Sequence, residues 1–399
     1  MQRYSFISRT MALSFGSYAQ SLMLRAYERL LPVRSIGGHV LIVQLGQIGD
    51  FVLTMPLIEA LKEKHGGSLR ISVLIDSINS GLAGDCGGID AVYEYDSKKY
   101  SRAHEKTVFP GTALTNSSFD CALWLRGDGS TFRWLAANRI PVRSVARFPN
   151  PMRSSWLSLM RNGLDEPHGD KNTKARYPHF VDSIMEIGGI ERSEPEREAR
   201  PSKMGSKAVD EGTGERVFIH IGSGGELRRW PEERFAELSL SLLGFEGRLN
   251  IILIGAKPDY ERADRIIRRI KHTGGRVANG CGSFELADLK TVFQRGALYI
   301  GLDSGPMHIA ASTGIPVVAL MGPQSPDVFG PMGESARVVY KAYPCSPCWQ
   351  FACVRNPGGG AGRCISDITA EEVFTEAKAL LKGGTTVEKD TAPLQCLLG

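Results

Sequence analysis

The stretch ALYIGLDSGPMHIAASTGIPVVAL (297–320) decides the fold of this 399-residue chain. It begins with an apolar run, 297–302, that is typical of a buried strand. Asp303-Ser304-Gly305-Pro306 then opens a short helix over 306–312, and the apolar run 316–320 predicts a second buried strand. Because two buried strands joined by a helix form a parallel βαβ unit, the stretch predicts an α/β protein.

The same alternation extends in both directions along the chain. Further strands are expected at 39–45, 69–75, 91–95, 121–126, 142–148, 216–222, 249–255 and 276–279, and further helices at 51–64, 231–243, 259–271 and 370–381. The segment 190–215 is charged, poor in apolar residues and interrupted by Pro and Gly, as linkers are. We therefore predict two Rossmann-like, doubly wound domains, 39–190 and 216–383, which are joined by a linker at 191–215 and face a central cleft. An extension (1–38) and a tail (384–399) complete the chain.

Composition excludes several classes of protein. Hydrophobic residues make up 42% and charged residues 23%, which is ordinary for a globular chain, and 8 cysteines are too few for a disulfide-dense protein of this length. We find no apolar run of about 18 residues, so a spanning helix is not expected. The net charge of +5 is too small for a broad nucleic-acid-binding face.

The basic excess is concentrated in residues 1–38, which hold five arginines against Glu28 alone. The segment lacks the compact apolar core of a secretory signal. Residues 11–31 mix apolar side chains with Arg and Tyr, as an amphipathic helix does. This pattern suits an interfacial helix on an anionic membrane. The alternatives are a helix packed on the domain and an extension with a misplaced start codon.

The loop LGQIGDFVLTMP (45–56) follows the first predicted strand. Its Gly46 and Gly49 let the backbone come close to a ligand. Asp50 stands at the start of the next helix, where an aspartate is most often a cap. The alternative is a carboxylate at the cleft edge that abstracts a proton. The loop lacks the G-x-G-x-x-G of a nicotinamide site and the Lys-Ser/Thr of a P-loop.

A second loop, HIGSGGELRRWPEERF (220–235), combines Ser223 and three glycines with Arg228 and Arg229. Backbone N–H groups and a guanidinium together suit a phosphate or diphosphate. In the alternative, both arginines are solvated and Trp230 is a core residue.

The turn at 303–306 offers polar groups to the same cleft. The free N–H groups at the start of its helix favour an anion, to which Ser304 can donate, and Asp303 can accept from sugar hydroxyls. His308 is expected either as a polar contact on the helix face or as a structural residue.

These residues resemble glycosyltransferase family 9, the heptosyltransferases that build the inner core of bacterial lipopolysaccharide. The resemblance covers roughly residues 40–373. It rests on Gly49-Asp50 with Pro56, FDCALWLRGD (119–128), Arg229-Trp230-Pro231 with Glu233-Arg234-Phe235, Asp303 to His308, and Gly322-Pro323.

The resemblance implies the GT-B architecture and an inverting transfer that requires no metal or other cofactor. It implies that Asp50 is the general base, that Arg228 contacts the donor diphosphate, and that 303–306 hold the diphosphate and sugar. Many members have Lys at the position of Arg228, and Arg keeps the charge with a different geometry. Glu261 is implied for the nucleotide ribose, although an exposed helix residue is an equal alternative. The expected donor-binding residues are Ser223, Arg228, Glu261, Asp303, Ser304, Gly305, Pro306 and His308.

We therefore expect a cytoplasmic, membrane-peripheral glycosyltransferase that moves a heptose, with ADP-heptose as its donor, to a lipid-linked lipopolysaccharide-core acceptor. The chain has no Asp-x-Asp motif to hold a diphosphate-bound divalent ion, and Arg and helix N-termini can stabilise the leaving group instead. The alternatives are a GT-B transferase with another nucleotide-sugar donor and a non-catalytic nucleotide-sugar-binding protein.

Four cysteines, Cys345, Cys348, Cys353 and Cys364, are spaced C-x2-C-x4-C-x10-C in a Pro- and Gly-rich loop. The pattern suggests a zinc or iron–sulfur site but fits no standard zinc ribbon. Free thiols and disulfides are the alternatives, and a reducing cytoplasm disfavours disulfides.

Overall fold

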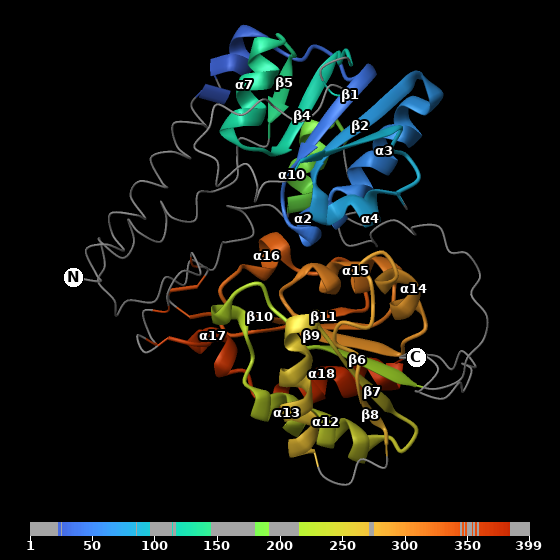
Figure 1. Ribbon diagram of the computed structural model, residues 1–399, viewed down its shortest axis with the longest axis vertical. Helices are drawn as coiled ribbons and strands as arrows, with labels where there is room; N and C mark the ends of the chain where they lie inside the picture. The colour runs from blue at the N-terminus through green and yellow to red at the C-terminus, as the bar shows by residue number, and fades with distance from the viewer. Residues whose placement is uncertain are drawn as a thin grey trace. The chain divides into compact units, whose positions relative to one another are not determined.

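The chain forms two α/β units, each built on its own parallel sheet (Figure 1). The computed structural model describes residues 23–24, 26–84, 86–95, 114, 117–144, 180–190, 215–270, 275–343, 345–346, 348, 353, 356 and 359–383. Unit 1 takes the described residues up to 144 together with 180–190, and unit 2 takes those from 215 onward. The tail and nearly all of the expected linker lie outside the described residues, and the expected cleft between the domains stays a prediction.

The sheet of unit 1 has five parallel strands in the order β3-β2-β1-β4-β5. The strands are β1 (Gly38–Gln44), β2 (Leu69–Asp76), β3 (Ala91–Tyr95), β4 (Cys121–Arg126) and β5 (Val142–Ser144). Residues 40–43 of the central β1 are fully buried, as their continuous apolar run predicts. The strand order reverses between β1 and β4, and ligands of open α/β sheets bind at such a point. Residues 145–148, expected in the last strand, lie outside the described part.

The helices of unit 1 are α2 (Ile48–Val52), α3 (Met55–His65), α4 (Ser80–Gly84), α7 (Gly129–Ala137) and α10 (Phe180–Ile187), with short 3₁₀ turns η1 (Gly66–Ser68) and η2 (Ser77–Asn79). The prediction of one helix over 51–64 was wrong, because the chain divides between α2 and α3. Pro56 has no N–H, so the carbonyl of Val52 lacks the donor that a continuous helix would supply. The carbonyl of Asp50 accepts from the hydroxyl of Thr54 at 2.8 Å. The break shortens α2 to five residues.

The end of the N-terminal extension packs on unit 1. Residues 26–30 are helical, and Leu24 is buried in the core that contains Leu41 and Phe132. The Tyr27 hydroxyl donates to the carbonyl of Ile140 at 3.1 Å. For this part of the extension the structure therefore favours a helix packed on the domain. Residues 1–22 lie outside the described part.

The sheet of unit 2 has six parallel strands in the order β11-β10-β9-β6-β7-β8. The strands are β6 (Arg216–His220), β7 (Asn250–Ile254), β8 (Val277–Asn279), β9 (Leu298–Leu302), β10 (Val317–Met321) and β11 (Ala336–Tyr340). The sequence patterns missed β11, because this edge strand leaves Arg337 and Val338 exposed and lacks a continuous apolar run. The strand order reverses between β6 and β9, which places the ligand-binding position of this sheet at their carboxyl ends.

The helices of unit 2 are α12 (Glu232–Phe245), α13 (Tyr260–Arg269), α14 (Leu289–Gln294), α15 (Gly305–Thr313), α16 (Pro326–Phe329), α17 (Arg363–Ser366) and α18 (Ala370–Gly383), with 3₁₀ turns η3 (Glu226–Arg228) and η4 (Lys257–Asp259). Trp230, between η3 and α12, is fully buried against Phe235 with ring centroids 4.8 Å apart. Its indole N–H donates to the carbonyl of Ile368 at 2.9 Å, just before α18. This anchor fixes the C-terminal end of the loop that follows β6.

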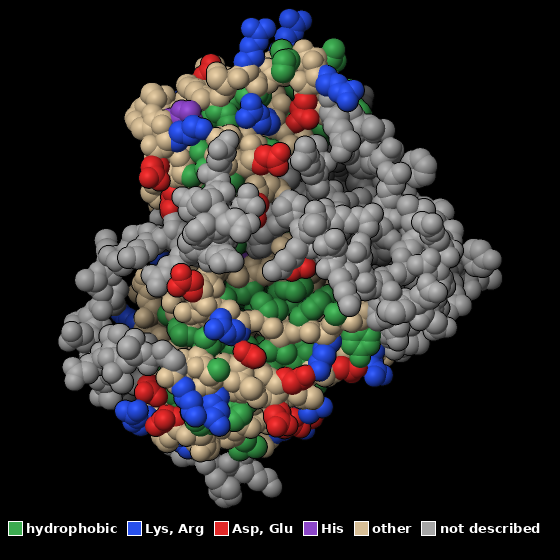
Figure 2. All heavy atoms as spheres, turned by 180° about the vertical axis from the view of Figure 1, so that it is seen from behind, with side chains coloured by type: hydrophobic (Ala, Val, Ile, Leu, Met, Phe, Trp, Pro, Cys, Tyr) green, Lys and Arg blue, Asp and Glu red, His purple; other side chains and the backbone are tan. Residues whose placement is uncertain are grey.

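The surface carries charges of both signs. In the coloured part of the face in Figure 2, Lys and Arg side chains are interspersed with Asp and Glu over both units. Among the described helices, none is long and apolar enough to cross a bilayer.

Candidate functional site

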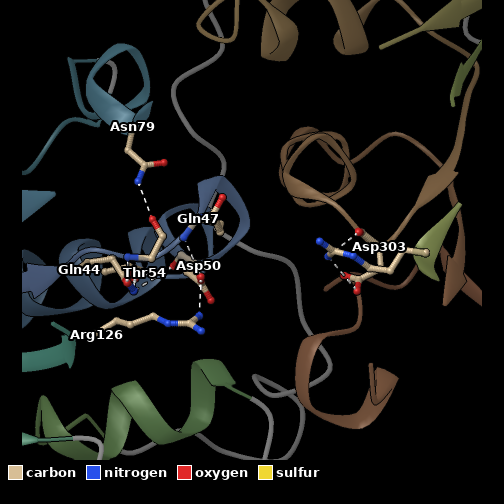
Figure 3. A network of polar contacts seen from close by, with 9 residues as sticks. Gln44, Gln47, Asp50, Thr54, Asn79, Arg126 and Asp303 are labelled. Atoms are coloured by element: carbon tan, nitrogen blue, oxygen red, sulfur yellow. Dashed lines mark hydrogen bonds and ion pairs between the residues drawn. The ribbon is translucent and has the colours of Figure 1, made fainter. Parts of the chain in front are cut away.

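In unit 2, two predicted motifs meet where β6 and β9 end. β6 leads into the glycine-rich loop and η3, and β9 leads into the turn before α15. The Arg228 guanidinium donates from Nη1 to the carbonyl oxygen of Asp303 at 3.1 Å and lies 3.5 Å from its Oδ2 (Figure 3). Arg228 and Asp303 are 75 positions apart in sequence. The strand order brings them together, because β6 and β9 are neighbours at the reversal of the sheet.

The Arg228 side chain lies at the carboxyl end of β9. It is only 24% exposed, and its Nε–H is buried without a hydrogen-bond partner among the described residues. A buried, unpartnered donor is costly unless a ligand satisfies it. A guanidinium held at a strand end with a free donor suits an anionic oxygen.

His220 is the last residue of β6, and the sequence analysis did not single it out. Its ring lies 3.2 Å, from Nδ1, from the hydroxyl of Ser304, the N-cap residue of α15. Because that hydroxyl donates to the carbonyl of Leu302 at 3.1 Å, we assign the proton of the imidazole to Nδ1. Burial, and to a smaller extent the nearby Arg262 guanidinium, lowers the pKa of His220 to about 4. The imidazole is therefore neutral at physiological pH and orients the Ser304 hydroxyl.

Ser304 is the N-cap of α15, and Pro306 occupies the first turn of this helix. The first N–H groups of a helix lack intrahelical acceptors and carry the positive end of its dipole. Gly305 lies at the same terminus, and His308, one turn further, is 5% exposed. The structure thus keeps the predicted set 303–308 at one strand end.

A carboxylate that the sequence analysis missed lies beside this loop. Asp259 Oδ2 accepts from the backbone N–H of Ala256 at 3.0 Å. A Cβ added to Gly222 would lie 2.6 Å from Asp259 Oδ2, and one added to Gly255 would lie 2.9 Å from Asp259 Cβ. Gly222 and Gly255 follow β6 and β7 and leave room for this side chain. Glycine at the ends of two neighbouring strands was the available signal.

Glu261, the residue expected at the nucleotide ribose, is exposed in the first turn of α13. Among the described residues, its carboxylate accepts no hydrogen bond from the loop after β6. Its role stays a prediction, and Asp259 is the carboxylate that lies against the strand ends.

Arg262, also missed from the sequence, joins the two ends of the loop after β6. It donates to the carbonyls of Ile221 at 2.8 Å and Trp230 at 2.5 Å, and only 9% of the residue is exposed. Ser223 Oγ donates within the loop, to the carbonyl of Gly225, at 2.9 Å. The loop that carries Arg228 is therefore held at both ends and in the middle.

In unit 1, Asp50 lies where β1 and β4 end, at the reversal of that sheet. Its Oδ2 accepts from Arg126 Nη1 at 2.6 Å and from the backbone N–H of Gln47 at 2.9 Å (Figure 3). Gln47 is the N-cap of α2, so Asp50 is the third helical residue in a capping box and not the cap itself. Both contacts use Oδ2 among the described residues.

A polar network fixes the backbone around Asp50. Gln44 Nε2 donates to Thr54 Oγ1 at 2.9 Å, and Gln44 Oε1 accepts from the N–H of Gly46 at 3.0 Å. Asn79 Nδ2 donates to the carbonyl of Gly46 at 3.1 Å. A Cβ on Gly46 would lie 2.5 Å from Asp50 Oδ2, so glycine is required there for the carboxylate to fit. The Asp50 side chain is 8% exposed. These contacts fix the backbone that carries it.

The charged residues of Arg126-Gly127-Asp128, at the end of β4, have separate roles. Arg126 pairs with Asp50, whereas the Asp128 side chain caps α7 and accepts from the hydroxyl of Tyr95 at 2.5 Å. Arg126 is the partner of Asp50 that sequence reasoning did not identify. Its place at the end of a strand next to β1 was the signal.

Known proteins resemble this chain in sequence and in fold. The family model for glycosyltransferase family 9 (heptosyltransferase) matches residues 145–357, more than half of the chain. The lipooligosaccharide heptosyltransferase 2 of Campylobacter jejuni is 32% identical over 163 residues, which are 40% of this chain and 48% of that protein. The lipopolysaccharide heptosyltransferase 2 of Salmonella typhimurium is 28% identical over 271 residues, which are 62% and 74%. The chain thus spans about half the length of the first relative and three quarters of the second.

Among solved structures, the ADP-heptose lipopolysaccharide heptosyltransferase II of Escherichia coli superposes with a TM-score of 0.59 at 20% identity. The superposition covers 86% of this chain and 98% of that one. It confirms the expected fold, the GT-B architecture of two Rossmann-like domains. The family match, which covers more than half of the chain, shows that the chain belongs to glycosyltransferase family 9 and is a glycosyltransferase.

Proposed function

We propose that this glycosyltransferase moves a heptose from ADP-heptose to a sugar of the lipopolysaccharide core, with inversion at the anomeric carbon. The observation that carries the proposal is the contact between Arg228 and Asp303 beside the N-terminus of α15. The contact holds the Arg228 guanidinium beside the free N–H groups at the start of α15, and these two kinds of donor suit a diphosphate. The names of the relatives support heptose and the lipopolysaccharide core as the sugar and the acceptor.

In the proposed mechanism, Oδ1 of Asp50 takes the proton of the acceptor hydroxyl. The oxygen of that hydroxyl attacks the anomeric carbon of the donor at the same time. The bond from that carbon to the donor diphosphate breaks on the opposite face, so the configuration inverts. Arg228 and the N–H groups of α15 stabilise the negative charge that grows on the leaving diphosphate. We propose that this stabilisation needs no metal ion.

Nucleotide binding tests the donor. We expect ADP, but not UDP, GDP, CMP or NAD, to raise the melting temperature of the full chain equally with magnesium and with a chelator. A ligand at one hundred times its Kd adds about 2.7 kcal/mol to the free energy of unfolding. A shift with UDP or GDP alone would keep the transferase and replace the donor. A shift that requires magnesium would contradict the metal-independent mechanism.

The general base is tested with Asp50→Asn. General base catalysis contributes about 10²- to 10⁴-fold, so kcat with ADP-heptose and a core acceptor should fall by that factor. The Kd of ADP should stay unchanged, because Asp50 belongs to unit 1 and the proposed nucleotide-binding residues belong to unit 2. Asp90→Asn is the matched control, since Asp90 pairs with Lys62 at the surface of the same unit. Wild-type kcat in Asp50→Asn would refute the assignment.

The basic N-terminal segment suggests contact with the cytoplasmic face of the inner membrane. A deletion that tests this should remove only residues 1–22, because Leu24 and Tyr27 pack on unit 1. The full chain should sediment with vesicles of anionic phospholipid, and the deleted chain should remain in the supernatant. Equal sedimentation would refute the role of the segment.

A further inference from the structure

Arg126, the last residue of β4, forms an ion pair with Asp50 that is unequally exposed to solvent. Its Nη1 donates to Asp50 Oδ2 at 2.6 Å (Figure 3). The Asp50 side chain is buried, whereas that of Arg126 is 56% exposed. An ion pair with one partner this open to solvent contributes little to the stability of a fold. Stability alone therefore does not account for the pair.

An irregularity in the sheet gives Arg126 its position. Strands β1 and β4 pair in parallel, and their register shifts between Val43 and Gln44. Gln44 lies opposite Arg126, whereas a regular register would place Leu125 there. An extra residue of this kind breaks the alternation of side chains along a strand, re-aims the side chain that follows, and is common next to active sites. β4 thus departs from regular pairing at the position that supplies the partner of Asp50.

The backbone of Arg126 is anchored to the loop that carries Asp50. The N–H of Leu45, the residue after β1, donates to the carbonyl of Arg126 at 2.7 Å. The N–H of Gln47, two residues further, donates to Oδ2 of Asp50 at 2.9 Å. The guanidinium and the carboxylate are therefore both tied to one short stretch of backbone, 45–47.

These contacts fix the plane of the Asp50 carboxylate. The terminal torsion of an aspartate has broad preferences, so its carboxylate is oriented by what it contacts. Among the described residues, both donors contact Oδ2, and rotation about the Cβ–Cγ bond would break both hydrogen bonds. The mechanism proposed above uses the other oxygen, Oδ1. A general base must lie within about 3 Å of the proton that it takes, and a misplacement of about 1 Å can lower a rate about 100-fold.

We propose that Arg126 is a positioning residue of the transfer reaction, which holds Oδ2 of Asp50 so that Oδ1 is presented to the acceptor hydroxyl. The inference rests on the proposed function, in which Asp50 is the general base. Arg126 keeps its own protons throughout, because a guanidinium stays charged in proteins. When the acceptor proton moves to Oδ1, the ion pair becomes a hydrogen bond from the guanidinium to a neutral carboxyl group. Arg126 thus acts through Asp50 and not on the substrate.

Steady-state kinetics with ADP-heptose and a core acceptor separate this role from acceptor binding. Arg126→Ala should lower kcat about 10- to 100-fold and leave the KM of the acceptor within about threefold of wild type. Arg126→Lys, which keeps the charge but not the planar guanidinium, should have an intermediate kcat. Arg70→Ala is the matched control, because it removes an exposed arginine near the start of β2, and it should keep the wild-type kcat. A raised KM at an unchanged kcat would mean that Arg126 binds the acceptor and would overturn the proposal.

A double-mutant cycle tests whether Arg126 acts through Asp50. Once Asp50→Asn has removed the base, the further substitution Arg126→Ala should lower kcat by less than about threefold. Ethylguanidinium should restore part of the kcat of Arg126→Ala, whereas the same concentration of sodium chloride should not. Effects that multiply in the double variant would show that Arg126 acts independently of Asp50. An equal stimulation of Asp50→Asn by ethylguanidinium would likewise overturn the proposal.

Folding and the fate of the proposed function are checked separately. Since Arg126 is more than half exposed, Arg126→Ala should keep the wild-type circular dichroism spectrum and the Kd of ADP. If it does not fold, Arg126→Gln, which keeps a donor of similar length, takes its place. Wild-type kcat in the Arg126 variant with an impaired Asp50→Asn would overturn the role of Arg126 and leave the base in place. Wild-type kcat in Asp50→Asn would overturn the base and the role of Arg126 together.

Discussion

Replacing His220 with glutamine should remove a large pH dependence from the stability of unit 2. The imidazole is 7% exposed at the end of β6 and bonded to Ser304, and its pKa in the folded chain is about 4 against 6.5 for the free side chain. The unfolded chain therefore binds more protons than the folded chain between these two pH values. By linkage, unit 2 loses stability as the pH falls from about 6.5 toward 4.

The size of the effect follows from the two pKa values. At pH 5 the unfolded imidazole is almost fully protonated, whereas the folded one is about nine-tenths neutral. The accumulated difference between pH 8 and pH 5 corresponds to about 1.5 pH units, or about 2 kcal/mol at 1.4 kcal/mol per unit. Glutamine keeps a donor for Ser304 but does not titrate, so His220→Gln should lose about 2 kcal/mol less than wild type over this range.

Urea unfolding at pH 8, 7, 6 and 5 measures the effect. Hydrogen-exchange mass spectrometry of peptides from β6 and β9 reports the free energy of unfolding of unit 2 separately from that of unit 1. His65→Gln, which changes a histidine of unit 1, is the control and should keep the wild-type slope in unit 2. Parallel pH curves for wild type and His220→Gln would show that His220 protonates equally in both states and would refute the reasoning.

Three other substitutions test the loop that follows β6. Arg228→Ala should raise the Kd of ADP, measured by calorimetry, at least about tenfold, because a charge-assisted hydrogen bond contributes about 1.5–3 kcal/mol. Arg229→Ala, which changes an exposed arginine, should leave this Kd unchanged, and equal effects of the two substitutions would contradict a specific contact. Gly222→Ala, whose Cβ would lie 2.6 Å from Asp259 Oδ2, should lower the free energy of unfolding by about 1–3 kcal/mol, whereas Gly225→Ala, with open space around its Cβ, should be close to neutral. Trp230→Phe leaves the buried carbonyl of residue 368 without its donor and should cost about 1–3 kcal/mol in thermal unfolding, and an unchanged melting temperature would argue against the anchor.

The sequence predicted most of the strands and the α/β class, and it placed residues 303–306 between a strand and a helix, because these follow from local patterns. The apolar runs of β1, β6 and β9 are buried on both faces and read as strands without knowledge of their neighbours. Helix α15 was placed within one residue at each end, since Ser304-Gly305-Pro306 marks its start in the sequence. The edge strand β11 escaped because its exposed side chains break the apolar pattern.

Only the tertiary structure decided which residues meet. The pairs Arg126 with Asp50, Arg228 with Asp303, and His220 with Ser304 are separated by 76, 75 and 84 positions. Each pair forms because two strands are neighbours where the sheet order reverses, and strand order is a property of the whole sheet. Packing likewise decides that Asp259, and not Glu261, lies beside the strand ends. Both carboxylates follow the end of β7 within seven residues, so their positions in the sequence do not distinguish them. A local pattern can place a charged residue at a strand end, but its partner is set by the strands that lie on either side.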